Sequence, residues 1–256
     1  HLMQALQASA ADTDNWKYSL HDKDELLDAV SSYYADRYGV DGIGRDQVMS
    51  CGAALHHLLV ALAELRRFYP KPFTLCAVTV DLGFPGADYS EIEELCRRLA
   101  VEYRVVPTEI GKVVFDIRHE KNPCSLCAKM RRGALHAAAK EMGCTSVALG
   151  HHFDDAVETF MLNLFYEGRI GCFSPVTYLS NTGLYLIRPM LYVPEKQIRY
   201  FASRASLPVA ASQCPANGNT ERESMKQLLH TLDREHKGIK HRIFGAMERG
   251  EVDGFK

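Results

Sequence analysis

The sequence predicts an α/β fold with a mostly parallel sheet and helices on both faces. Short apolar segments rich in β-branched residues alternate with longer segments whose apolar residues recur at helical spacing. This alternation is typical of βα units, whose right-handed crossovers leave successive strands parallel. The chain has 256 residues, of which 46% are hydrophobic, enough for one large domain or two small ones. We expect ligands at the carboxyl ends of the strands.

The predicted elements follow the order that βα units require. An amphipathic helix comes first, and a short strand reading QVM precedes the second helix. After Gly171 the pattern becomes irregular, and helical spacing returns from about Glu195. The predicted helices between these points are 24–38, 54–68, 89–102, 128–143 and 154–168, and the predicted strands are 73–81, 103–110 and 145–150.

Charge is unevenly distributed along the chain, whose net charge is −2. Residues 1–50 hold 9 acidic and 4 basic side chains, whereas the rest holds 23 acidic and 26 basic ones. A mildly basic body is compatible with RNA binding, and equally with an ordinary mixed surface. No apolar segment approaches the roughly 20 residues that span a bilayer, and no signal peptide opens the chain. We therefore expect a cytoplasmic protein without a membrane segment.

Three cysteines form the most informative set. Cys124 and Cys127 are spaced as C-x-x-C at the start of a helix, and Cys214 lies far downstream. Three thiolates without an obvious fourth ligand predict an iron–sulfur cluster with one open iron, which can bind a substrate or carry sulfur. The alternatives are a redox pair, or a zinc site completed by Cys214 and a histidine. We interpret the other cysteines as small buried hydrophobic residues: Cys51, Cys76, Cys96, Cys144 and Cys172.

A second polar motif, GHHFDDAVET, lies at a predicted strand-to-helix turn. Asp154 and Asp155 fall in the first helical turn, where carboxylates interact favourably with the helix dipole. That capping role explains one of them, but two adjacent carboxylates after two histidines also suit Mg²⁺ and a nucleotide phosphate tail. The polar residues that end predicted strands are Asp81, Gly150, His151 and His152.

Four ordered segments resemble the PP-loop tRNA thiolases, and most closely the tRNA 2-thiocytidine synthetase (tRNA-cytidine 2-sulfurtransferase) family. The segments are PCSLCAKMRRG, LGHHFDDAVETFMLNLFYEG, LIRPMLYVPEKQIRYFA and CPANGNTERESMKQLL. The resemblance covers about residues 54–229. It implies an adenine-nucleotide α-hydrolase-like (PP-loop) fold, ATP with Mg²⁺, a [4Fe-4S] cluster, and a tRNA anticodon-loop base as substrate. A homodimer is also implied.

The resemblance also implies a mechanism and residue roles. ATP would adenylate the C2 carbonyl oxygen of a cytidine, because oxygen is a poor leaving group without activation. A sulfur atom held at the open iron, supplied by a cysteine desulfurase or another donor, would then displace AMP, with the protein contributing positioning and charge stabilisation. The implied roles are cluster ligation by Cys124, Cys127 and Cys214, proximity to ATP and Mg²⁺ for Asp154 and Asp155, and contact with phosphate or tRNA for Arg131 and Arg132.

One departure from the family concerns its phosphate-binding loop, S-G-G-x-D-S, whose backbone amides would cradle the pyrophosphate. The corresponding stretch here reads DQVMSCGAALHHLL, in which only Ser50 and Gly52 match. Residues 4–50 resemble instead the N-terminal part of fold-type I aminotransferases. We therefore expect an N-terminal helical segment, 1–50, fused or divergent, and a thiolase domain with C-terminal helices, 51–256. A non-catalytic cluster- or zinc-binding tRNA-interacting relative without the phosphate loop is the alternative function, and a pyridoxal-phosphate transaminase is a third.

Overall fold

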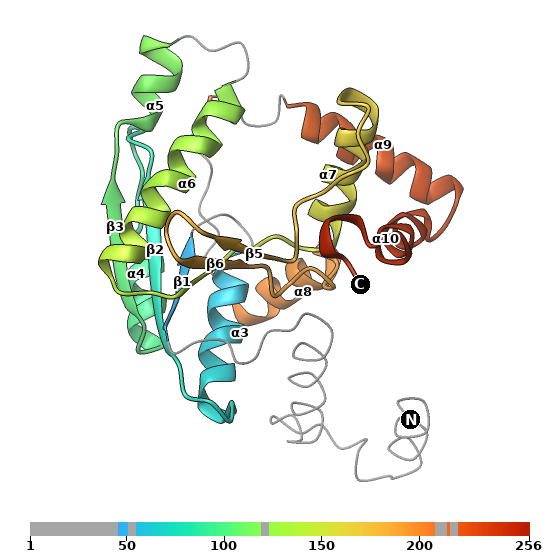
Figure 1. Cartoon of the computed structure of the whole chain (residues 1–256). Helices are drawn as coiled ribbons and strands as arrows, with labels where there is room; N and C mark the ends of the chain where they lie inside the picture. Colours follow the sequence, from blue (N-terminus) through green and yellow to red (C-terminus); the bar gives the residue numbers. More distant parts are fainter. Residues whose placement is uncertain (1–45, 51–54, 119–122, 208–213, 216–219) are drawn as a thin grey trace, which may run out of the picture. The chain divides into compact units, whose positions relative to one another are not determined.

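A six-stranded sheet with the order β3-β2-β1-β4-β6-β5 forms the centre of the fold (Figure 1). The computed structural model describes residues 46–50, of which it gives the backbone, and residues 55–118, 123–207, 214–215 and 220–256. The elements are β1 (Asp46–Ser50), α3 (Leu55–Phe68), β2 (Thr74–Asp81), α4 (Ser90–Arg98), β3 (Glu102–Pro107), α5 (Ile110–Lys112), η2 (Val113–Ile117), α6 (Pro123–Glu141), β4 (Ser146–Ala148), α7 (Phe153–Tyr166), β5 (Val176–Leu179), β6 (Leu184–Ile187), α8 (Glu195–Ala205), α9 (Glu221–Glu235), α10 (Ile239–Arg249) and η3 (Val252–Gly254).

The sheet is parallel except at one edge. Strands β3, β2, β1, β4 and β6 run in the same direction, and β5 pairs antiparallel with β6. The chain moves from β1 outward to β2 and β3, and then returns to place β4 on the other side of β1. The strand order therefore reverses between β1 and β4, which is the topological switch point where doubly wound sheets bind ligands. The predicted α/β fold is confirmed.

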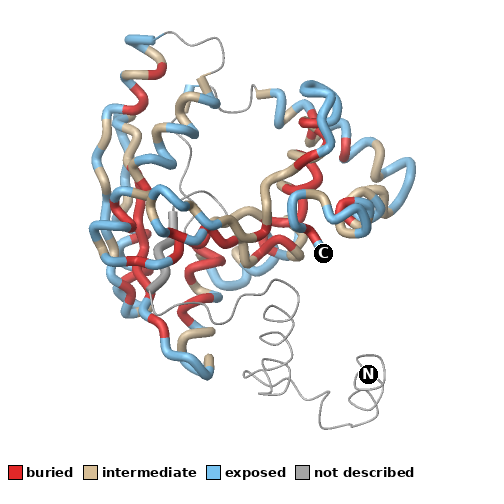
Figure 2. Tube along the Cα trace, viewed as in Figure 1, coloured by how far each residue is buried: buried red, intermediate tan, exposed pale blue. Residues whose placement is uncertain are grey.

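Helices cover both faces of the sheet because successive side chains of a strand point to opposite faces. In β2, Leu75 and Ala77 pack into a core with α3, α4 and α8. Cys76, Val78 and Val80 point the other way and pack against η2 and α6. Figure 2 shows the buried residues concentrated along the strands and the inner sides of these helices. The predicted two-sided covering of the sheet is thus present.

A third hydrophobic core lies among α7, α9 and α10. Leu229 of α9, Met247 of α10 and Phe255 near the C-terminus are fully buried. Phe153, the first residue of α7, packs against the Phe244 ring, with 4.8 Å between the centroids. The C-terminal helices therefore pack directly against the start of α7.

The structure corrects several predicted boundaries. The helix predicted to extend to residue 102 ends at Arg98, because Ala100 adopts a left-handed conformation (φ 51°) that turns Val101 into the core. The stretch after Gly171 contains the β5–β6 hairpin, which the sequence analysis missed. The C-x-x-C pair lies in the first turns of α6, which confirms its predicted place at the start of a helix.

Some predictions fall outside the described residues. These are the predicted N-terminal segment apart from residues 46–50, with its helix 24–38, and the residues Cys51 and Gly52. Strand β1 is five residues long, two more than the predicted QVM, and it pairs with both β2 and β4. In the part of the chain that the structure describes, none of the helices combines the length and the apolarity that crossing a membrane requires.

Candidate active site

The carboxyl ends of β1, β4 and β6 lie side by side. The register aligns Met49 with Ala148 and Ala148 with Ile187, so the chain leaves all three strands at one level. The GHHFDD motif follows β4 and leads directly into α7. The sequence therefore places its candidate residues beside the topological switch point, where a ligand is expected.

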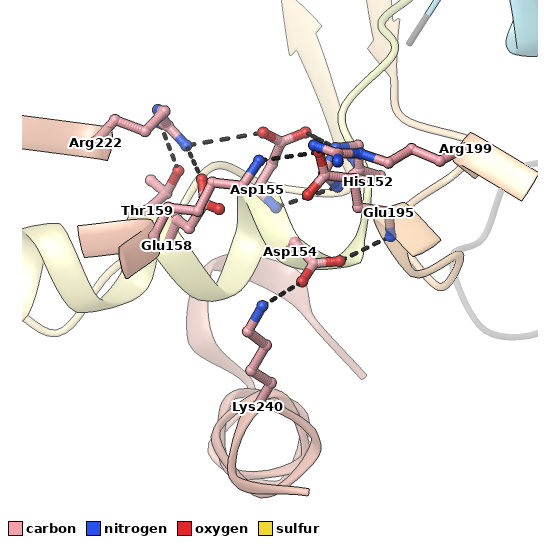
Figure 3. Close-up of polar contacts among 10 residues, drawn as sticks. His152, Asp154, Asp155, Glu158, Thr159, Glu195, Arg199, Arg222 and Lys240 are labelled. Atoms are coloured by element: carbon pink, nitrogen blue, oxygen red, sulfur yellow. Dashed lines mark hydrogen bonds and ion pairs between the residues drawn. The ribbon is translucent and has the colours of Figure 1, made fainter. Parts of the chain in front are cut away.

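Asp155 and His152 together cap the N-terminus of helix α7. His152 is the N-cap residue, and its backbone N–H donates to Asp155 Oδ2 at 2.9 Å. In return, the Asp155 N–H donates to His152 Nδ1 at 3.4 Å, which completes a capping box. The other oxygen, Oδ1, lies 3.8 Å from Arg222 Nη1 (Figure 3). One of the two aspartates thus has the capping role considered from sequence, and its proximity to ATP and Mg²⁺ stays a prediction.

Asp154 joins three helices. Its carboxylate is buried, with Oδ1 accepting from Lys240 Nζ of α10 at 2.7 Å and Oδ2 accepting from the Glu195 N–H at the start of α8 at 2.8 Å (Figure 3). Burial alone would raise the pKa of Asp154, but the bonds from Lys240 and the Glu195 amide more than offset burial and hold the pKa below its ordinary value. A Mg²⁺ role for Asp154 stays a prediction, and it would require these contacts to rearrange.

Glu158 and Thr159 hold the first turn of α9. Arg222 Nη1 lies 3.3 Å from Glu158 Oε2, and Arg222 Nη2 donates to Thr159 Oγ1 at 3.0 Å (Figure 3). Glu158 is only 4% exposed, and its burial raises the pKa to about 7 although Arg222 opposes the shift. Because Arg222 lies in the first turn of α9, this contact fixes the start of α9 against α7.

The raised pKa of Glu158 predicts a pH-dependent stability. Between the ordinary value of 4.5 and about 7, the folded protein keeps a proton that the unfolded chain releases. The contribution of Glu158 to stability should therefore fall as the pH rises through this range, by about 3 kcal/mol in total at 1.36 kcal/mol per pKa unit. His151, whose pKa is lowered to about 4, contributes in the opposite direction. Urea unfolding between pH 5 and pH 8 isolates the Glu158 contribution as the difference between the wild type and Glu158→Gln, and exposed Glu91→Gln should behave as the wild type does. Equal slopes for the wild type and Glu158→Gln would contradict the assignment.

The three cysteines of the predicted cluster lie near one another. Cys124 is exposed, and Cys127 and Cys214 are half-buried. Burial raises the pKa of the Cys127 thiol, the positive charge of Arg131 lowers it, and Cys214 and Cys124 raise it further. Both Cys214 and Cys124 are therefore close enough to act on Cys127 electrostatically. Among the described residues, no three His, Cys, Asp or Glu side chains converge closely enough to hold a single metal ion.

Other predicted residues have structural contacts of their own. Asp81 Oδ1 accepts from the Gly83 N–H at 2.9 Å and from the Tyr89 hydroxyl at 3.2 Å, which orders the turn after β2. His151 packs its ring against Phe173, with 4.7 Å between centroids. The remaining predicted residues are Gly150, half-buried, Arg131 and Arg132, exposed on α6, and Ser50, described by its backbone at the end of β1. Their proposed binding roles stay predictions.

Sequence reasoning missed four charged residues at this site: Arg188, Glu195, Arg222 and Lys240. Arg188 and Glu195 lie in the segment LIRPMLYVPEK, and Arg222 lies in NTERE, so two family-like segments contained the signal. Lys240 lies outside every matched segment. Its partner Asp154 is 86 positions away, and no local pattern predicts such a pair.

Comparison with known proteins gives concordant results. A family model described as a PP-loop domain matches residues 48–231. The tRNA-cytidine(32) 2-sulfurtransferase of Geobacter sulfurreducens is 34% identical over 239 residues, which cover 91% of each chain. The enzyme of the same name from Aliivibrio fischeri (strain MJ11) is 36% identical over 79% of this chain and 68% of its own. Among solved structures, the U34-tRNA thiolase NcsA from Methanococcus maripaludis with its [4Fe-4S] cluster superposes with a TM-score of 0.68 at 22% identity, covering 90% of this chain and 80% of NcsA. That last likeness is one of fold.

Proposed function

This chain belongs to the PP-loop domain family and to the tRNA-cytidine(32) 2-sulfurtransferases within it, and from that membership we propose that it transfers sulfur to a tRNA cytidine in an ATP-dependent reaction. The product would be 2-thiocytidine in the anticodon loop. The observation that supports the proposal is that Cys124 and Cys214, from distant parts of the sequence, are both near enough to Cys127 to raise its pKa.

The three cysteines suit a [4Fe-4S] cluster. Fe–S clusters are held by thiolates, and each thiolate binds a different iron, so the three ligands need not converge on one point. The positive charge of Arg131 partly opposes the burial that raises the pKa of Cys127, and so favours the thiolate that a cluster requires. When bound, the cluster supplies an iron without a protein ligand, which can hold the sulfur that enters the product.

The chain's own residues provide binding and orientation in this proposal. ATP, with Mg²⁺ near Asp154 and Asp155, would lie at the carboxyl ends of β1 and β4, where its α-phosphorus can receive the cytidine O2. Transfer of the adenylyl group to that oxygen releases pyrophosphate, and attack of sulfur at C2 then releases AMP with the oxygen. The exposed Arg131 and Arg132 of α6 present positive charge beside Cys127, where tRNA phosphates would approach.

Binding of ATP·Mg²⁺ is the first test of this proposal. We expect titration calorimetry on anaerobically reconstituted protein to show micromolar affinity, roughly −8 kcal/mol. Micromolar binding would mean that residues other than an S-G-G-x-D-S loop hold the phosphates. An intact cluster without detectable ATP binding would favour the alternative, a tRNA-interacting relative that does not activate the base. Thiolation of unmodified tRNA, followed by nucleoside mass spectrometry, then tests the reaction itself.

The partners follow from the same proposal. The protein would bind tRNA and receive sulfur from a donor such as a cysteine desulfurase, in the cytoplasm, where its tRNA substrate occurs. A homodimer is part of the proposal through the family likeness. Sedimentation of the reconstituted protein, alone and with tRNA, measures its oligomeric state and its RNA binding together.

A further inference from the structure

Arg188 lies at the carboxyl end of β6. It directly follows β6, and Ile187, the last residue of that strand, accepts a hydrogen bond from the Leu149 N–H at 2.9 Å. Leu149, in turn, lies one position beyond the aligned residues of β1 and β4. Two strand spacings therefore separate Arg188 from Ser50, which corresponds to about 10 Å between their backbones. Arg188 therefore lies at the carboxyl edge of the sheet, where doubly wound sheets bind their ligands.

Among the described residues, the positive charge of Arg188 has no acidic partner. Its guanidinium carbon lies 4.9 Å from the centre of the Phe173 ring, and Nη1 donates to the Ser174 carbonyl. Nε is buried and has no hydrogen-bond partner, and no carboxylate in the described part of the chain forms an ion pair with this residue. Burial lowers the pKa of Arg188 to about 10, a sign that the charged form is poorly solvated.

The neighbours of Arg188 do not neutralise its charge. His151 packs on the Phe173 ring, has a buried Nδ1 without a partner, and has its pKa lowered to about 4 by burial and by Arg188, so the imidazole is neutral at physiological pH. Cys172 has its pKa raised to about 12 and stays a thiol. A cation that is removed from water and surrounded by neutral groups costs free energy unless an anion pairs with it.

We propose that Arg188 binds a phosphate group of the adenine nucleotide at the carboxyl ends of β4 and β6. This inference rests on the proposed function and assigns part of the phosphate binding to a side chain. A guanidinium is suited to the task because it makes paired, charge-assisted hydrogen bonds to phosphate oxygens. The side chain is half-buried, so part of it remains exposed to solvent. His151, with its unpartnered Nδ1, packs on the same Phe173 ring as Arg188.

Variants of the reconstituted full chain test the proposal by calorimetry with ATP, AMP and adenosine. Arg188→Met should weaken ATP binding roughly tenfold to hundredfold, at 1.4 kcal/mol per tenfold, and Arg188→Lys should recover part of the affinity by keeping the charge. Adenosine, which has no phosphate, should bind both variants as it binds the wild type. Arg98→Met, which removes an exposed arginine of α4, is the matched control and should bind ATP normally.

Stability provides a readout that separates binding from structure. Because Arg188 is an unpaired, largely desolvated cation, Arg188→Met should unfold at the same or higher denaturant concentration than the wild type. A large loss of stability, with adenosine and ATP weakened alike, would show that Arg188 is structural and overturn the proposal. Unchanged ATP binding with weaker tRNA binding would assign the phosphate to RNA and overturn it as well. If the wild type itself binds no ATP, the proposed function fails with it, whereas equal ATP binding by wild type and Arg188→Met refutes only the role of Arg188.

Discussion

Replacing Cys214 with alanine is expected to lower the iron content of anaerobically reconstituted protein from about four atoms per chain to nearly none. The two thiolates of α6 remain, but the cluster loses its third protein ligand. Thiolation of tRNA should be lost with the cluster. Cys214 lies in a loop and is half-buried, so the fold should survive the change. Iron and sulfide assays, with the visible absorbance, measure the result.

The matched control for this change is Cys172→Ala. Cys172 is also half-buried, but its thiol donates to the Ala156 carbonyl at 3.5 Å and does not belong to the predicted set. Its variant should keep full iron and sulfide. A Cys214→Ala protein that retained both would refute the ligand assignment. A colourless, air-stable wild type that binds one zinc ion instead would support the zinc alternative.

Replacing Lys240 with methionine is expected to destabilise the protein by about 3–5 kcal/mol, because it leaves the Asp154 carboxylate buried without its cation. Asp154, with its lowered pKa, contributes stability above its unfolded pKa and loses it as the pH falls. Without Lys240, burial dominates and the pKa of Asp154 should rise above the unfolded value, so its effect reverses sign. The loss caused by Lys240→Met should therefore be larger at pH 7 than near pH 4.

Urea unfolding at the two pH values measures the effect of Lys240→Met. Lys237→Met, at an exposed lysine just before α10, should change stability little. The double variant Lys240→Met with Asp154→Asn should recover part of the loss, because it removes the stranded charge. Equal stabilities for the two lysine variants at pH 7 would show that the Asp154–Lys240 pair does not hold α10 to α7.

The sequence predicted those parts of the molecule that local patterns encode. The alternation of strands and helices identified the sheet, and Glu195 was correctly placed at the start of a helix. The hairpin β5–β6 was not predicted because each strand has only four residues, too few for a clear alternation. Its exposed tyrosines, Tyr178 and Tyr185, pack against each other across the two strands. Short edge strands are stabilised by such cross-strand pairs more than by periodicity.

The candidate site also contains residues that could be predicted from the sequence and residues that could not. The cysteines and the aspartates could be selected from their spacing and type, because both are chemically distinctive. Their partners could not, since Lys240 and Arg222 reach Asp154 and Glu158 only after the C-terminal helices have packed on α7. Arg188 gave no signal by itself. Its interest comes from what surrounds it, a phenylalanine, a neutral histidine and no acid, and that environment exists only in the folded chain.

The central position of β1 has a consequence for how the chain is made. Its pairing with β2 joins residues fewer than thirty positions apart, but its pairing with β4 aligns Gln47 with Ser146, about a hundred positions later. At a synthesis rate of about 5–20 residues per second, one edge of β1 would stay open on the ribosome for roughly 5–20 seconds. Nascent chains should therefore first form a β1–β2–β3 sheet with an unprotected edge. That edge is where chaperone binding, or mispairing with a neighbouring chain, would compete with native folding.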